Sequence, residues 1–238
     1  MKLRFMCLLL LAGLAWSMVT SAQVSLSALD QGISGPSTQV LVLGTAHLSN
    51  APKGFNAISL QPVLTRLAAF KPNIIAIEFI SGQGCGLMEQ YPTIYSPKDI
   101  SSYCTNTTAA KAATRLDIPT AVAAMHKTLA DWPQRPTAVQ RRHLAAIFLA
   151  CNEPASALVQ WLQLPEAERH AGNGLDDALV TQLNKRTKSN NEAYQIGARL
   201  AVHLGLQRVY PIDDHTGDNI VIPSDQEKAF NSALLISQ

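Results

Sequence analysis

The sequence predicts an α/β protein with a small, mainly parallel sheet and a large helical portion between the second and third recognisable strands. Two short apolar runs, at 40–43 and 73–79, have the length and the β-branched content of buried strands. An amphipathic helical stretch separates these two runs, and a mainly helical pattern from 107 to 205 precedes a third strand-like run at 208–215. Strand, helix and strand in close succession favour a right-handed parallel unit.

The first strand leads into a candidate functional residue. Val40 to Leu43 predicts a buried strand, and Gly44 allows the backbone to turn sharply after it. His47 then lies just past the carboxyl end of the strand, at the edge of an open α/β sheet where ligands bind. A hydrogen-bonded structural histidine is the alternative interpretation.

The second strand carries an unusual carboxylate. Residues 58–70 show apolar positions at helical spacing, with Pro62 tolerated near the first turn. The run at 73–79 is nearly all apolar, as a strand covered on both faces should be, but Glu78 interrupts it near its carboxyl end. A carboxylate there is costly unless it is paired or bound to a metal. We therefore place Glu78 at the same sheet edge as His47, with a glutamate turning into solvent as the alternative.

Residues 81–106 predict a long irregular segment. The run from Gly82 to Gly86 follows a strand, but Leu87 occupies the third glycine position of a dinucleotide-binding fingerprint and no clean helix opens before Pro92. Cys85 and Cys104 lie in this segment, and we expect them to form a disulfide in an oxidising compartment, which leaves Cys151 as a buried free thiol.

The segment that follows predicts a series of helices separated by prolines and glycines. On the last of them, Glu192 and Arg199 lie on one stripe, and we single out Glu192 as a secondary site candidate. The expected helices cover 107–116, 119–130, 137–150, 154–163, 175–187 and 191–204.

A third polar strand end follows this helical portion. The run at 208–215 reads as a strand that ends in Asp213-Asp214-His215, and Pro211 within it indicates an edge position or a break. Imidazole and carboxylate groups at three neighbouring strand ends would serve as ligands for zinc, manganese or iron, or as an acid/base pair. The same residues also suit a polar turn.

The sequence also predicts a signal peptide, a linker and a single domain. Residues 1–22 have a basic start, a short apolar run and small residues before Gln23, which is typical of a secretion signal; an uncleaved anchor is the alternative. Residues 23–37 read as a linker and 38–238 as a single α/β domain. An amphipathic helix opening at Ser224 ends the chain, and we expect further residues to follow it.

Charge argues against two classes of partner. Without Lys2 and Arg4 the chain carries 17 basic and 17 acidic residues, so electrostatics favour neither nucleic acid nor an anionic membrane. We expect a small-molecule or peptide substrate, no nucleic acid, and no stable membrane insertion after signal cleavage. The expected location is periplasmic or secreted.

Two motifs resemble a known group of proteins. Gly44-Thr45-Ala46-His47 after a strand, and Pro72 to Glu78 one helix later, resemble the opening of the TraB/Tiki and ChaN/erythromycin-esterase-like superfamily, and more narrowly an exported bacterial branch of unknown function. The resemblance implies an α/β domain with His47 and Glu78 in its active site. Members of the superfamily include metal-dependent proteases, esterases and haem-binding proteins.

The chain also departs from this superfamily. The second Gly-x-x-His of Tiki-like proteins has no counterpart, and Asp213, Asp214 and His215 occupy the expected place. Asn190-Asn191-Glu192 stands where TraB-like proteins carry a helical Glu-Arg-Asp motif. Both departures leave the metal and the reaction open.

These observations predict an exported hydrolase, peptidase-like or esterase-like, that uses a strand-end site. The expected catalytic residues are His47, Glu78 and Asp213, and the expected metal ligands are His47, Glu78, Asp214 and His215. The alternative from another class is a protein that binds haem, a metal or a peptide without turnover, and a purely structural exported domain is the third possibility. A serine nucleophile is disfavoured because no Gly-x-Ser-x-Gly is present.

Overall fold

The computed structural model describes residues 35–236, so the expected signal at 1–22 and most of the expected linker at 23–37 lie outside the described residues. Residues 42–220 form one compact unit, and residues 35–41 and 221–236 belong to a second one. The second unit contains helix α10 (Ser224–Ile236), which agrees with the expected terminal helix. Among the described residues, no helix combines the length and the apolar character needed to cross a membrane.

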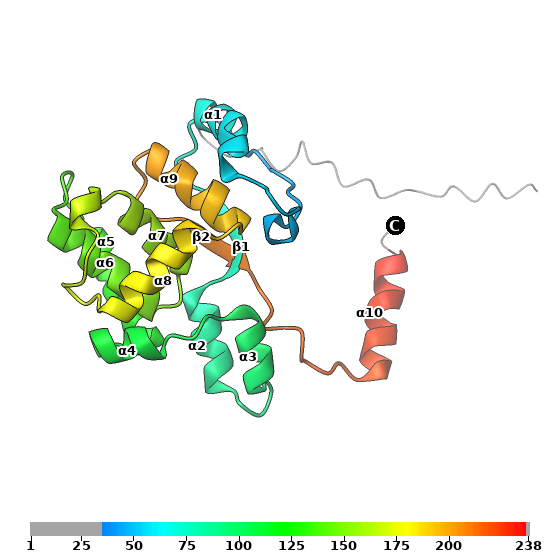
Figure 1. The fold of residues 1–238 in the computed structure, drawn as a ribbon. Coiled ribbons are helices and arrows are strands. Elements are labelled where there is room, and N and C mark those ends of the chain that lie inside the picture. Colours follow the sequence, from blue (N-terminus) through cyan, green and yellow to red (C-terminus); the bar gives the residue numbers. More distant parts are fainter. Residues whose placement is uncertain (1–34, 237–238) are drawn as a thin grey trace, which may run out of the picture. The chain divides into compact units, whose positions relative to one another are not determined.

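The predicted combination of a small parallel sheet and a large helical portion is confirmed in the 42–220 unit (Figure 1). Strand β1 (Ala76–Ile80) pairs in parallel with β2 (Tyr210–Asp213), and the chain between them is mainly helical. The register places Ala76 opposite Tyr210, Ile77 opposite Pro211 and Ile80 opposite Asp213, with an irregularity between the last two pairs. Pro211 thus lies in an edge strand, as expected.

The prediction of a strand at 40–43 is wrong. This stretch has no regular secondary structure in the described chain, and its side chains are exposed, Val42 by 88%. An apolar β-branched run favours extended backbone, but a strand also needs a neighbouring strand to supply hydrogen-bond partners. The sequence pattern reports the first condition and carries no information about the second.

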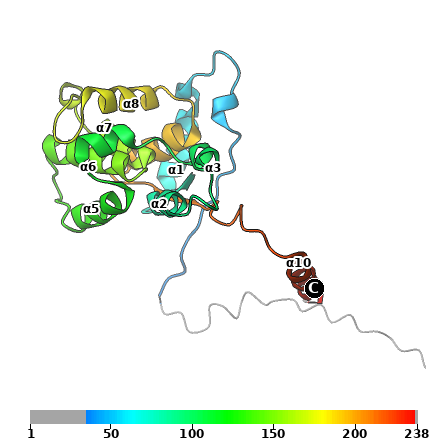
Figure 2. The same ribbon diagram turned by 90° about the horizontal axis from the view of Figure 1, so that it is seen from below.

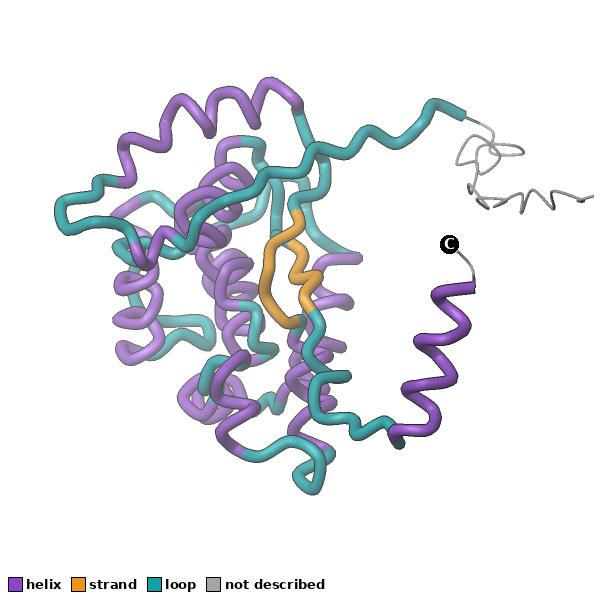
Figure 3. The backbone as a smooth tube through the Cα atoms, turned by 90° about the vertical axis from the view of Figure 1, so that its right-hand side faces the viewer, coloured by secondary structure: helices purple, strands orange, loops and turns teal. Residues whose placement is uncertain are grey.

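The expectation that the second strand is covered on both faces is also wrong. Ile75 and Ile77 are buried, whereas Ile74 is 63% exposed and Glu78 is exposed as well. Figure 3 shows the two strands side by side with helices behind them. The π-helix η5 (Ala193–Ala198) contacts β1, and Ser156 of α7 donates to the carbonyl oxygen of Val209 just before β2, so the helices cover one face.

The six predicted helices between 107 and 204 are confirmed, with shifts of one or two residues at most of their ends. The last of them is divided into the π-helix η5 and a short α-helix. The bounds are α4 (Thr108–Thr114), α5 (Ile118–Ala130), α6 (Ala138–Ala150), α7 (Pro154–Leu162), α8 (Asp177–Thr187) and α9 (Arg199–His203). The helix expected at 58–70 is present as a 3₁₀ turn (Ala57–Leu60) followed by α1 (Gln61–Phe70).

The irregular segment predicted at 81–106 is wrong, because it contains α2 (Gly82–Gln90) and α3 (Pro97–Tyr103). The Ser81 hydroxyl accepts a hydrogen bond from the Gly84 amide at 3.0 Å and caps α2. A Cβ atom added to Gly82 would lie 1.7 Å from the carbonyl oxygen of Cys151. The glycines that argued against a helix therefore allow this one to pack closely against its neighbours.

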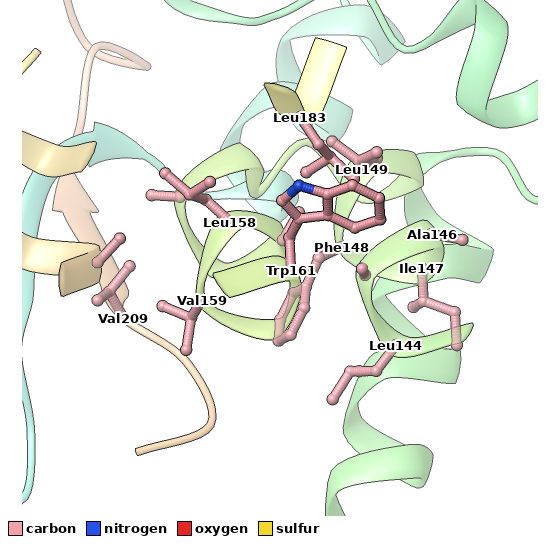
Figure 4. Close-up of a cluster of buried hydrophobic side chains, with 14 of the residues drawn as sticks. Leu144, Ala146, Ile147, Phe148, Leu149, Leu158, Val159, Trp161, Leu183 and Val209 are labelled. Carbon is pink, nitrogen blue, oxygen red and sulfur yellow. The ribbon is translucent and has the colours of Figure 1, made fainter. Parts of the chain in front are cut away.

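Two consecutive helices that pack against each other, α6 and α7, form the centre of the core. Figure 2 shows α5, α6, α7 and α8 in this spatial order. Phe148 and Trp161 are fully buried, and Figure 4 shows the Trp161 indole beside Leu149 and Leu183. The indole nitrogen donates to Asn184 Oδ1 at 3.2 Å, so the largest core side chain buries no unpaired donor.

The predicted disulfide is confirmed: the Sγ atoms of Cys85 and Cys104 lie 2.00 Å apart. Cys151 is a buried free cysteine, also as expected. Burial and the nearby Glu153 carboxylate raise the pKa of its thiol, so Cys151 is a core residue and a poor nucleophile.

Candidate functional site

His47 and Glu192 meet although 145 positions separate them in the sequence. His47 directly precedes a 3₁₀ turn (Leu48–Asn50), and its Nδ1 lies 2.9 Å from Glu192 Oε1. The Leu48 amide donates to Glu192 Oε2 at 3.1 Å. The carboxylate therefore uses both oxygens to hold one short segment, which fixes the position of the imidazole.

The two partners of this pair differ in exposure. The His47 side chain is 68% exposed and the Glu192 side chain 18%. Among the described residues, Nε2 of His47 makes no hydrogen bond. The carboxylate thus lies at the base of the site, and the second ring nitrogen remains accessible to a ligand.

Electrostatics couple the two groups. The hydrogen bond and the charge of Glu192 raise the pKa of His47, and the charge of Glu78 adds a smaller contribution in the same direction. Partial burial acts to raise the pKa of Glu192, but hydrogen bonds from His47 and from backbone amides outweigh it and the pKa is lowered. Glu192 is therefore the ionised partner, and His47 is the group that exchanges a proton.

The π-helix η5 places Glu192 beside the sheet. The Asn191 side chain accepts from the Ala193 amide at 2.9 Å, next to Glu192. Tyr194 makes an edge-to-face contact with Phe79 of β1, with ring centroids 5.8 Å apart. A Cβ atom added to Gly197 would lie 2.8 Å from Ile77, so glycine is needed for this close approach. Such single π-turns in helices are frequently found at functional sites.

Glu78 lies on β1 next to Phe79 and is exposed. Its charge makes a small contribution to the raised pKa of His47. Among the described residues, Glu78 has no hydrogen bond or ion pair with either His47 or Glu192. The structure therefore joins His47 most directly to the secondary candidate Glu192.

Asp213, Asp214 and His215 form a separate polar cluster at the end of β2. Nε2 of His215 lies 3.1 Å from Asp213 Oδ2, and Nδ1 lies 2.7 Å from Asp218 Oδ2. The ring stacks on Tyr103, with centroids 3.7 Å apart. Both ring nitrogens are thus engaged, an arrangement that suits a charged imidazolium in a polar turn.

The hydrogen bonds of the described chain do not link this cluster to His47 or Glu192. Between residues 35 and 236, no three side chains of the His, Cys, Asp and Glu types are grouped so that they could hold a metal ion. The expected ligand set therefore does not assemble around the His47 pair, and metal binding stays a prediction.

Two residues that contact His215, namely Asp218 and Tyr103, were not predicted from the sequence. Asp218 lies three positions after His215, a spacing that suits a side-chain contact across a turn. Tyr103 comes from α3, inside the segment that we expected to be irregular, so only the fold reveals that it stacks on His215. The role of Glu192 as the nearest partner of His47 likewise depends on tertiary contacts.

Comparisons with protein-family models, with curated proteins and with solved structures found no match to this chain. The geometry of the site is therefore the basis for a functional proposal.

Proposed function

We propose that this chain is an exported hydrolase in which His47, positioned by Glu192, acts as general base and then as general acid on an ester or peptide bond. The observation that carries this proposal is the 2.9 Å contact from Glu192 to Nδ1, which leaves Nε2 accessible. A carboxylate that orients an imidazole through one nitrogen, and leaves the other for proton transfer, is the base-and-orienter part of many hydrolytic sites.

The chemistry needs only water as a co-reactant. Neutral His47 donates from Nδ1 to Glu192 and accepts a proton from water at Nε2, while the water oxygen attacks the substrate carbonyl carbon. The tetrahedral intermediate then collapses, the bond to the leaving oxygen or nitrogen breaks, and Nε2 returns the proton to that atom. Glu192 stabilises the imidazolium between these steps.

Glu78 is the second carboxylate in this proposal. Its exposed position on β1 and its electrostatic effect on His47 suit a group that orients the attacking water. Asp213, the third expected catalytic residue, bonds to His215, and its catalytic role stays a prediction.

Two observations support export. The Cys85–Cys104 disulfide suits an oxidising compartment such as the periplasm or the extracellular space. The basic start and apolar run of residues 1–22 support the same location.

The resemblance of the His47 and Glu78 motifs to the TraB/Tiki and ChaN/erythromycin-esterase-like superfamily supports hydrolysis.

The test uses panels of p-nitrophenyl esters and fluorogenic peptides with the wild type, His47→Gln, Glu192→Gln and Glu78→Gln. Loss of the acid/base residue should lower kcat by roughly 10²- to 10⁴-fold. His143→Gln is the matched control, because His143 is exposed on α6 and makes no contact with the site. Equal rates for the wild type and His47→Gln would refute the proposal.

The binding alternative is distinguished by the same variants. Titration with haem and with zinc, manganese and iron salts measures ligands directly. Stoichiometric binding lost in His47→Gln, together with no turnover of any substrate, would favour a binding protein.

A further inference from the structure

A cleft of about 830 Å³ lies within the 42–220 unit, between helices α2 and α5 and the residues that end β2. We call it the α2–α5 cleft, and its walls include Gly86, Leu87, Ile118, Val122, Ile212 and Asp214. It opens beside the carboxyl ends of the two parallel strands, since Ser81 follows β1 directly and Asp214 follows β2. Ligands of α/β sheets bind at this end of the strands.

The walls of the cleft are largely apolar and accessible. Leu87 is 41% exposed and Ile212 is 70% exposed, and Val122 is half-buried. On α5, Ile118, Val122 and His126 recur every four residues, so one helix face forms a whole wall. Apolar side chains that line a concave surface favour a ligand with apolar groups of its own.

One carboxylate at the rim is fixed in place. Asp214 Oδ1 accepts from the Thr216 amide at 2.8 Å and from the Thr216 hydroxyl at 2.7 Å. The ordinary pKa of an aspartate, about 3.9, lies well below neutral pH, so Asp214 carries a negative charge there. Within the described chain, its Oδ2 makes no hydrogen bond and Asp214 has no ion pair.

The charged side chains that line the cleft are acidic. No lysine or arginine is found among the described residues that line it. Asp213 also lines the cleft, but His215 pairs with it. Asp214 therefore supplies a negative charge without an ion pair among the described residues, next to apolar walls, and a ligand that combines apolar groups with a cation complements both features.

We propose that the α2–α5 cleft binds a peptide segment in which apolar side chains precede a lysine or arginine, with the cation paired to Asp214. The apolar side chains lie against Leu87, Val122 and Ile212. This binding needs neither His47 nor turnover, so it can be tested independently of the proposed hydrolysis.

Fluorescence anisotropy tests the proposal with three labelled, amidated peptides, Leu-Ala-Leu-Lys, Leu-Ala-Leu-Gln and Leu-Ala-Leu-Glu. The wild type should bind the lysine peptide about fivefold more tightly than the glutamine peptide, as an accessible ion pair allows, and the glutamate peptide least. This preference should weaken as the salt concentration rises.

Two variants separate the charge from the apolar wall. Asp214→Asn should remove the preference for lysine over glutamine, and Leu87→Ser should weaken both peptides by roughly three- to tenfold. Both side chains are exposed, so circular dichroism and thermal unfolding should match the wild type. Asp131→Asn is the control, because it removes the same charge at the far end of α5, outside the cleft.

Three results would overturn the proposal: no saturable binding of the lysine peptide, equal affinity for all three peptides, or equal effects of Asp214→Asn and Asp131→Asn. His47→Gln is measured in parallel and should bind like the wild type. Loss of hydrolysis in that variant with binding retained shows that the two proposals are tested independently.

Discussion

The ion pair between Glu153 and Arg208 offers the sharpest test of how the helical portion is joined to the sheet. Arg208 Nη2 lies 2.9 Å from each carboxylate oxygen of Glu153. The Arg208 side chain is only 13% exposed and the Glu153 side chain only 4%. Arg208 precedes β2 and Glu153 precedes α7, so the pair connects a strand to the central helix pair.

Replacing Glu153 with Gln leaves the Arg208 guanidinium buried without a counter-charge. Breaking one side of a buried pair costs about 3–5 kcal/mol in the free energy of unfolding. The pair itself is less favourable than this value suggests. Burial raises the pKa of Glu153 and exceeds the opposing effect of the arginine charge, so much of the Coulomb attraction is offset by lost hydration.

The double variant Glu153→Gln/Arg208→Met should therefore recover at least half of the loss. Methionine retains much of the packing of the aliphatic arginine stem, although it lacks the guanidinium group, whose Cζ lies 4.6 Å from the centroid of the Tyr210 ring. Urea denaturation followed by circular dichroism measures each free energy of unfolding. Glu89→Gln, on an exposed position of α2, is the control and should change stability by less than about 0.5 kcal/mol.

A loss below about 1 kcal/mol in Glu153→Gln would refute the assignment of a buried pair. A double variant no more stable than the single one would show that the unpaired charge is not the cause of the loss.

Three further predictions concern the site and its surroundings. Glu192→Gln removes the charge that raises the pKa of His47, so the acidic limb of the pH–rate profile should move to lower pH; an unmoved limb would contradict the pairing. Hydrogen bonding to a carboxylate raises the pKa of His215, so its stabilisation is complete below the unfolded pKa and is lost as pH rises through the folded one. The urea midpoint of the wild type should therefore exceed that of His215→Asn by more at about pH 5.5 than at about pH 9, and equal differences would disprove the linkage. Gly82→Ala would place a Cβ 1.7 Å from the Cys151 carbonyl oxygen, so overpacking should cost about 1–3 kcal/mol or more, and an unchanged melting temperature would refute the close contact.

Local patterns predicted most of the helical portion because helix signals are local. Apolar spacing and the prolines at helix starts placed the elements from Thr108 to His203 close to their observed positions. The disulfide between Cys85 and Cys104 was also predictable, since both cysteines lie in one segment and Cys151 has a helical, apolar context.

The two incorrect predictions, a strand at 40–43 and an irregular segment at 81–106, have the same physical cause. Val40 to Leu43 resembles a strand by composition, yet a strand depends on a partner edge that lies elsewhere in the sequence. The glycines from Gly82 to Gly86 disfavour a helix by propensity, yet contacts with Cys151 and Ile118 make a side chain there unfavourable and compensate for the flexible backbone. In both cases long-range packing decides the outcome.

The candidate site shows the same division. Residue chemistry after strand-like runs was enough to select His47 and Glu78, because an imidazole or a carboxylate near a strand end is conspicuous in an apolar context. The sequence by itself thus determined the fold class, the helices between Thr108 and His203, the disulfide and the residue types of the candidate site. Only the tertiary structure decided that Glu192 is the partner of His47 and that His215 pairs with Asp213 and Asp218, because a hydrogen bond depends on distances of a few ångströms that spacing along a chain does not encode.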